Sequence, residues 1–282
     1  MRRVVLLLVV LCFSVFSFAQ DAAEKINEAN EAMQSKDYAK ALELYESAMA
    51  NLGEVQVPDA INFNIGLAAY NSDSYAKAIE YFDKAIAAGA NVEKALEYKA
   101  GAYGKMEKYD EAVAAYKEAI AANPESAATM SYNAGIIAYK GEIFENAVDF
   151  FTTAVEGGYK GETAQYYKAV CYNKLDNDEA YVTTLEEGIA KFPGDDKMTS
   201  ALANVYVSEG NSLYKKGAAI LGAANQKVND GEMTTVDDAY TAEYAKAKKE
   251  FTAAVEVLEK AIEIDPTNAN ANKLLEACKA VI

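Results

Sequence analysis

Small and aromatic residues recur along this chain with the spacing of paired helices. Six small residues lie 37, 34, 35, 34 and 41 positions apart: Ala29, Gly66, Ala100, Gly135, Ala169 and Gly210. Nine positions after each of the first four stands an aromatic ring: Tyr38, Tyr75, Tyr109 and Phe144. Alanine, a second ring and a second alanine then follow at steps of three or four residues, which place them on one face of a helix. The pattern predicts two helices per repeat.

The rest of the chain supports an all-α fold. Alanine, glutamate, lysine and leucine dominate the periodic stretches, and no alternating strand pattern stands between hairpin turns. Small residues let two helices cross closely, and the ring beside them fills the remaining space. Because one helix pair cannot bury its apolar stripe alone, we expect successive pairs to stack into a solenoid.

We call this recurring series of small and aromatic residues the ladder. In the third repeat it runs from Ala112 through Tyr116 to Pro124. Its spacing and its period resemble those of the tetratricopeptide repeat (TPR) family over residues 22–282. The resemblance implies a right-handed superhelical solenoid of about six helix-turn-helix units. We place the units at residues 22–55, 59–92, 93–126, 128–161, 162–195 and 203–268. The fifth unit departs most from the pattern, with Asp178 at a ring position and Gly188 at an alanine position, and we expect looser packing there.

An insertion at residues 218–249 interrupts the sixth unit. Two apolar stripes with helical spacing flank a turn at Asn229, Asp230 and Gly231, followed by Thr234 and Thr235 as expected helix caps. These features predict an elongated helical hairpin that projects from the stack. The last stretch, residues 268–281, is predicted to be a capping helix that covers the final apolar face.

The first 19 residues are typical of a secretory signal peptide. Arg2 and Arg3 precede an apolar run that is shorter than a membrane-spanning helix and ends at Ala19, where we expect cleavage. We therefore expect a single exported domain, residues 20–282, in the periplasm or at the outer envelope. Lipidation at Cys12 is an alternative, although Leu11 precedes it where a small side chain is required.

Composition excludes several classes of function. The net charge is −16 for the whole chain, which argues against nucleic-acid binding and agrees with a solvated acidic exterior. There is no histidine, and both arginines precede residue 4, so catalytic triads and zinc motifs are excluded. We predict no enzyme, no cofactor and no metal. One alternative is calcium binding at the acidic turn 176–179, although the spacing of its acidic residues differs from that of a calcium-binding loop. The other is a carbohydrate-processing enzyme that uses a pair of aspartate or glutamate side chains.

Cys171 and Cys278 are predicted to be buried and unpaired.

The first helices of successive units line the concave groove of such a solenoid, which is its default binding surface. The candidate groove residues are Asn30, Phe63, Asn64, Tyr70, Lys94, Tyr132, Tyr139, Tyr166 and Asn173. Tyrosines suit an extended peptide or a sugar, although many of them fit the packing ladder equally well. Some relatives grip a C-terminal carboxylate with basic residues in the first and third units. Asn30, Asn64 and Lys94 match that pattern, but Ile26 replaces its first lysine and Tyr98 its last basic residue. Most of the charge needed is therefore missing, and we do not expect this mode of binding.

The resemblance implies a non-catalytic interaction scaffold or adaptor in a Gram-negative cell envelope. It would bind a protein or peptide partner through the groove, the hairpin or both, and the sequence leaves the partner and the oligomeric state open. The alternative is a binding protein for an extended glycan or peptide in a tyrosine-lined groove.

Overall fold

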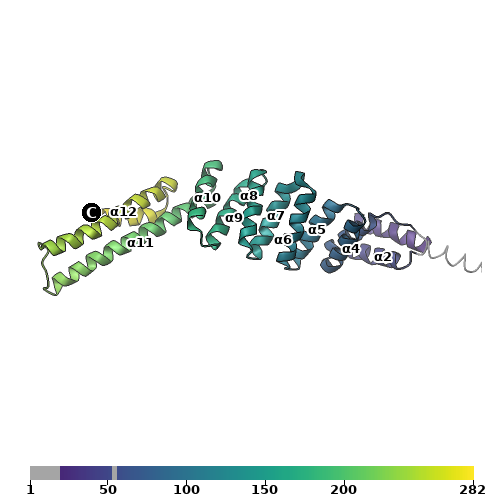
Figure 1. The fold of residues 1–282 in the computed structure, drawn as a ribbon, viewed down its shortest axis with the longest axis horizontal. Helices are drawn as coiled ribbons and strands as arrows, with labels where there is room; N and C mark the ends of the chain where they lie inside the picture. The colour runs from purple at the N-terminus through teal and green to yellow at the C-terminus, as the bar shows by residue number, and fades with distance from the viewer. Residues whose placement is uncertain (1–19, 53–55) are drawn as a thin grey trace, which may run out of the picture. The chain divides into compact units, whose positions relative to one another are not determined.

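The computed structural model describes residues 20–52 and 56–282, and every regular element in these ranges is a helix (Figure 1). This confirms the all-α prediction, whereas the predicted signal peptide lies outside the described residues. The chain forms two compact units, residues up to Gly161 and Glu162–Ile282, which we call unit 1 and unit 2. That residues 20–282 form a single domain stays a prediction.

Unit 1 is a series of short helices joined by tight turns. Residues 20–34 are helical, and the following elements are α2 (Tyr38–Ala50), α3 (Ile61–Asn71), α4 (Tyr75–Ala87), α5 (Val92–Lys105), α6 (Tyr109–Ala122), the 3₁₀ turn η1 (Pro124–Ser126), α7 (Ala127–Lys140) and α8 (Phe144–Glu156). Consecutive helices contact one another, as the ladder predicts for stacked pairs.

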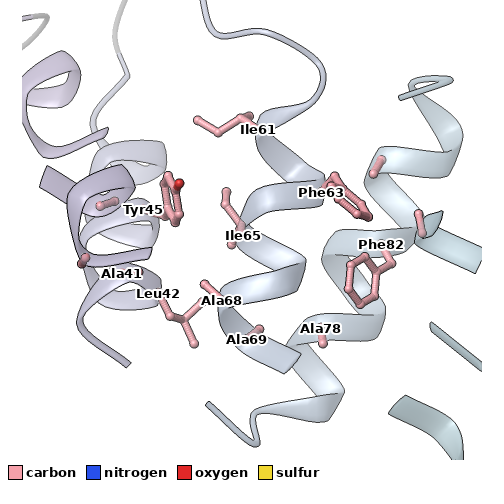
Figure 2. Packing of buried hydrophobic residues seen from close by; sticks show 14 residues of the cluster. Ala41, Leu42, Tyr45, Ile61, Phe63, Ile65, Ala68, Ala69, Ala78 and Phe82 are labelled. Carbon is pink, nitrogen blue, oxygen red and sulfur yellow. The ribbon is translucent and has the colours of Figure 1, made fainter. Parts of the chain in front are cut away.

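The small residues and rings of the ladder form the core of unit 1. Figure 2 shows the Tyr45 ring of α2 pointing towards Ile65 of α3, and both are buried, as is Ala41. The glycines of the ladder lie directly against phenylalanines of the next helix. A Cβ on Gly66 would stand 2.6 Å from Cε1 of Phe82, so only glycine leaves room for this ring.

In each of the first five helix-turn-helix repeats, the turn between the two helices contains a residue in the left-handed conformation that is not glycine. Lys36, Asp73, Glu107, Glu142 and, in unit 2, Asp176 have φ between 54° and 62°. The following residue donates its N–H back to the helix, as Asp37 N does to Ala32 O at 2.9 Å, which closes the helix end. Because a side chain at positive φ is strained, each turn costs about 1–2 kcal/mol that glycine would avoid.

Unit 2 contains short helices, two long ones and a final short one. The elements are α9 (Gly161–Lys174), α10 (Asp178–Lys191), α11 (Asp196–Asn229), α12 (Asp238–Ile264) and α13 (Ala269–Lys279). The predicted hairpin is confirmed, because α11 and α12, of 34 and 27 residues, run side by side beyond the repeat. α11 begins at Asp196, seven residues before the predicted start of the sixth unit, because Asp195 accepts from Met198 N and caps it there.

Small residues and polar pairs hold the hairpin together. A Cβ on Gly217 would lie 3.0 Å from Cε1 of Phe251, and Ala224 and Ala247 are buried. The Tyr240 hydroxyl donates to Asn225 Oδ1 at 2.9 Å across the pair. The predicted turn is confirmed, and Gly231 in it is left-handed with φ 76°. The prediction of Thr234 and Thr235 as helix caps is wrong. Asp237 is the N-cap of α12, and Thr234 donates its backbone N–H and its hydroxyl to the Asp237 carboxylate.

The fifth repeat is closely packed at Gly188, one of the positions where it departs from the pattern. Gly188 lies so close to α11 that a Cβ would stand 2.4 Å from Sδ of the fully buried Met198. The buried Gln165 donates from Nε2 to Thr184 O at 2.9 Å. Met198 therefore fills the space beside Gly188, while the looser packing predicted for the fifth repeat as a whole stays a prediction. Cys171 in α9 and Cys278 in α13 are buried free thiols, as predicted.

The last helix packs on the pair formed by α11 and α12. Ala271 and Cys278 of α13 are buried, and Leu274, Leu275 and Val281 pack against the cluster around Phe251 and Leu258. Asn268 caps the helix by accepting from Ala271 N at 3.0 Å. α13 therefore covers the apolar end of unit 2, as the capping prediction requires.

Candidate partner-binding groove

The aromatic residues predicted to line a groove in unit 1 take part in packing. Phe63 is only 7% exposed and lies with its ring centroid 5.9 Å from that of Phe82, so it belongs to the core. Tyr70 is half-buried and contacts the rings of Tyr75 and Tyr98 at 5.6 and 5.3 Å. Burial raises its pKa above the ordinary value of 10, and the neighbouring Tyr98 and Glu97 add to the shift.

Two further predicted tyrosines of unit 1 lie in ring contacts on α7. Tyr132 contacts the ring of Tyr159 at 5.7 Å, and Lys160 Nζ stands 4.5 Å from the Tyr132 centroid. Tyr139 contacts the ring of Phe144 at 5.9 Å. These tyrosines are partly exposed, so a ligand role for them stays a prediction.

The polar residues predicted for the same surface differ in their exposure and in whether they already form hydrogen bonds within the protein. Asn30 Oδ1 accepts from the Tyr45 hydroxyl at 2.5 Å, so one end of this amide is already engaged. Asn64 is partly buried on α3, and Lys94 and Asn173 are exposed on α5 and α9. Their binding roles also stay predictions.

Unit 2 contains a groove between α11 and α13 with a volume of about 480 Å³. One face of each helix lines it, with residues spaced three or four apart. The lining residues are Asn204, Val207, Ser208, Asn211 and Tyr214 of α11 and Asn270, Lys273, Leu274 and Ala277 of α13. We call this hollow the α11–α13 groove.

A second hollow of about 650 Å³ continues along α11 towards α9 and α10. It shares Asn204 and Ser208 with the α11–α13 groove, so the two form one open surface. Tyr166, one of the predicted residues, lines it together with Tyr181. Burial raises the pKa of Tyr181, and the nearby Tyr166 phenol adds to this, so the Tyr181 side chain is a neutral hydroxyl donor at physiological pH.

Three asparagine side chains of the α11–α13 groove make no hydrogen bond within the described parts of the chain: Asn204, Asn211 and Asn270. Two neighbouring asparagines at the start of α13 are engaged: Asn268 caps the helix, and Asn272 donates to Pro266 O at 3.1 Å. A free carboxamide offers both donors and an acceptor, which is the complement of a peptide group. The groove therefore presents amide chemistry that the fold itself does not use.

The charge on this surface differs from that of the whole chain. The charged residues lining the two hollows are Asp196, Lys197 and Lys273. Lys197 Nζ lies 5.8 Å from the Tyr166 ring centroid, so that lysine is partly engaged. A chain of net charge −16 thus has a groove that is neutral to weakly basic. Such a groove favours neutral or acidic ligands over basic ones.

Sequence reasoning missed this groove, although a signal was present. Tyr166 lies three residues before the small residue Ala169, and Asn173 lies four residues after it. The same offsets from Gly210 give Val207 and Tyr214, and both line the groove. This signal is weak in the sixth unit, because the insertion at residues 218–249 interrupts the repeat pattern after Gly210. Asn270 and Lys273 had no signal, because α13 was treated only as a cap.

Residues 20–52 and 56–282 contain neither a membrane-spanning helix nor a metal cluster. No helix there has the length and apolar character needed to cross a membrane. The same ranges contain no group of three or more cysteine, aspartate or glutamate side chains placed to hold a metal ion.

Family models described as tetratricopeptide repeats match four parts of the chain: residues 26–93, 99–162, 163–195 and 242–268. The matched ranges together cover more than half of the chain. No curated protein matches it.

Several solved structures of TPR proteins are similar to this chain. A TPR protein from Parabacteroides merdae is 18% identical with a TM-score of 0.50, and the match covers 92% of this chain and 99% of that one. A TPR repeats protein from Bacteroides fragilis is 23% identical over 93% and 99% of the two chains, with a TM-score of 0.40. YrrB, described as a TPR protein with an unusual peptide-binding site, is 20% identical over 67% and 96%, with a TM-score of 0.51. With its repeated ladder, its stacked helix pairs and these matches, the chain belongs to the tetratricopeptide repeat family.

Proposed function

We propose that this protein is a non-catalytic adaptor that binds an extended segment of a partner polypeptide along α11 in unit 2. TPR proteins generally mediate protein–protein interactions. The observation that carries the proposal is the set of uncommitted amides of Asn204, Asn211 and Asn270 in a groove of about 480 Å³. A segment in extended conformation exposes backbone N–H and C=O groups that these amides complement.

Apolar side chains beside the amides give the segment places to bury its own side chains. Val207, Tyr214 and Leu274 line the same groove and are each partly exposed. Burying them against a ligand contributes roughly 25 cal/mol per Å² of apolar area. A peptide ligand is also named for YrrB, which agrees with this ligand class.

The test uses peptides selected from a random library against the protein. In the double variant Asn204→Ala and Asn211→Ala, the groove keeps its shape because alanine is the better helix former. We expect the selected peptides to bind this variant about tenfold more weakly, since two hydrogen bonds of about 0.5–1.5 kcal/mol each are lost.

The matched control is Asn229→Ala, the same substitution on the same helix outside the groove, which should leave binding unchanged. Equal affinity of the double variant and the control would contradict the proposal. Binding of glycans in place of peptides on a mixed array would favour the alternative ligand class.

The proposal includes export, because the sequence of residues 1–19 is typical of a secretory signal peptide. Fractionation of cells that express the chain with and without these residues tests this part. Export predicts a processed, periplasmic or envelope-associated product only when they are present.

A further inference from the structure

We infer that two copies of this chain pair antiparallel through the outer face of α12, with Asp238 of each copy beside Lys249 of the other. The outer face is the side of α12 that is turned away from α11, and its residues are all exposed: Asp238, Ala242, Ala245, Lys249 and Thr252. None of them lines the α11–α13 groove, so the inference goes beyond the proposed function and does not depend on it.

Burial along α12 defines this face. Phe251 packs against Gly217 of α11, and Ala247 is buried on the same side of α12. At 3.6 residues per turn, Ala245 and Lys249 point the opposite way. The residues of the outer face follow one another at intervals of four and three, which is the spacing by which one helix meets a second in a coiled coil. The face therefore suits a helix as its partner, and its charges decide which helix it can bind.

Charge is segregated along α12, and this observation carries the inference. From Asp237 to Glu243 the chain has three acidic residues and no lysine, whereas residues 244–252 contain three lysines and one acid. Asp238 and Lys249 are the charges of the outer face, and they lie roughly 16 Å apart along the helix. This separation exceeds the screening length of about 8–10 Å at physiological salt, so the two do not neutralise each other within one copy. Neither makes an ion pair with another of the described residues.

An antiparallel second copy would bring these charges together. In one register, Ala242 of each copy lies opposite Ala245 of the other, and the small side chains let the two helices approach closely. Asp238 and Lys249 are centred on the same point of α12 as the two alanines, so this register also sets each Asp238 opposite a Lys249. The arrangement has the two-fold symmetry that is usual for a dimer of identical chains.

The neighbouring charges favour the same orientation. Asp237 and Lys248 lie along one edge of the outer face, so they also meet between antiparallel copies. A parallel pair in register would place Asp238 against Asp238 and Lys249 against Lys249, which like-charge repulsion disfavours. The contact covers residues 238–252, about 22 Å of helix, so we expect a weak dimer that forms at high protein concentration.

The test reverses the two charges singly and together. Sedimentation velocity of the purified full chain over a concentration series measures the dimerisation constant. Asp238→Lys or Lys249→Asp alone should weaken dimerisation about tenfold at low salt, because two like-charge contacts replace two attractive ones. The chain carrying both changes should dimerise again. An equimolar mixture of the two single variants should do the same, since every pair between the two chains then joins opposite charges.

Glu263→Lys is the matched control. It reverses a charge at an exposed position on the same side of α12 but outside the paired stretch, so it should leave dimerisation unchanged. Circular dichroism should show the same helix content for every variant.

Three outcomes would overturn the inference. One is a chain that stays monomeric at every concentration at low salt. Another is a dimer that the single reversals do not weaken, because the copies would then meet on a different surface. The last is the loss of dimerisation in both single variants without recovery in their mixture, which rejects the antiparallel register. None of these outcomes affects the peptide-binding test with Asn204→Ala and Asn211→Ala, so failure of the dimer and failure of the proposed function are distinguished.

Discussion

Two glycines of α11, Gly210 and Gly222, allow the substitution of glycine by alanine to be tested at a crowded and at an open position of the same helix. A Cβ on Gly210 would lie 2.6 Å from Cγ of Leu258 and 2.7 Å from its Cδ2, whereas a Cβ on Gly222 would meet nothing within 4 Å. Leu258 is fully buried on α12, so its side chain has little room to move away. Alanine at the two positions should therefore change stability in opposite directions.

The magnitudes follow from helix propensity and overpacking. Replacing glycine by alanine within a helix stabilises it by about 1 kcal/mol, and Gly222→Ala should gain about 0.5–1 kcal/mol. Gly210→Ala gains the same propensity, but carbon atoms pack at about 3.5–4 Å, so Leu258 must shift by roughly 1 Å. Overpacking of this kind costs about 1–3 kcal/mol. We expect a net loss of about 1–2 kcal/mol.

Urea unfolding followed by circular dichroism measures both variants against the unmodified chain. A second background, the Leu258→Ala variant, lacks the side chain that collides with the new methyl group. In that background Gly210→Ala should become stabilising, which yields a coupling energy between the two sites. If Gly210→Ala raised the unfolding midpoint in the unmodified chain as Gly222→Ala does, the close-crossing explanation of the ladder would be refuted.

Three other predictions concern the turns, the cap and the tyrosines. Glu107→Gly should raise the free energy of unfolding of unit 1 by about 0.5–1 kcal/mol, seen as a higher thermal midpoint, because the left-handed turn loses its strain while glycine adds chain entropy. Removal of residues 268–282 should expose the apolar cluster around Phe251 and cause association in light scattering, and a stable monomer would contradict the capping role of α13. Burial and the hydrogen bond to Glu186 raise the pKa of Tyr206 to about 12, so its proton is held in the folded state above the ordinary pKa of 10. Stability should accordingly fall as the pH rises from 10 towards 12, with phenolate absorbance showing late ionisation that Tyr206→Phe diminishes.

The repeat and its core could be predicted because they depend on local spacing. Ala41 and Tyr45 follow Ala29 at fixed offsets, and their burial confirms that the offsets mark the helix face that packs inward. The hairpin was also predictable, since its apolar stripes keep helical spacing on both sides of a glycine turn. The start of α11 and the cap of α12 were not, because Asp195, Asp237 and Thr234 are all competent capping residues and only the backbone selects among them.

The α11–α13 groove was harder to predict, because its character depends on which asparagine side chains form no hydrogen bond within the folded chain. Nothing in the sequence distinguishes Asn268, which caps α13, from Asn270, whose amide is free two residues later. Tertiary placement alone decides which amide is used by the fold. In the fifth repeat, Met198 of the next helix likewise fills the space beside Gly188, a contact that no local pattern could reveal.

α11 is one unbroken helix that connects the α11–α13 groove with the turn of the hairpin. Its first half carries Asn204 and Asn211, and its last residue, Asn229, lies at the turn of the hairpin. From Tyr214 to that turn the helix rises about 22 Å at 1.5 Å per residue. One uninterrupted helix therefore joins the wall of the groove to the tip of the hairpin, and no flexible loop separates the two.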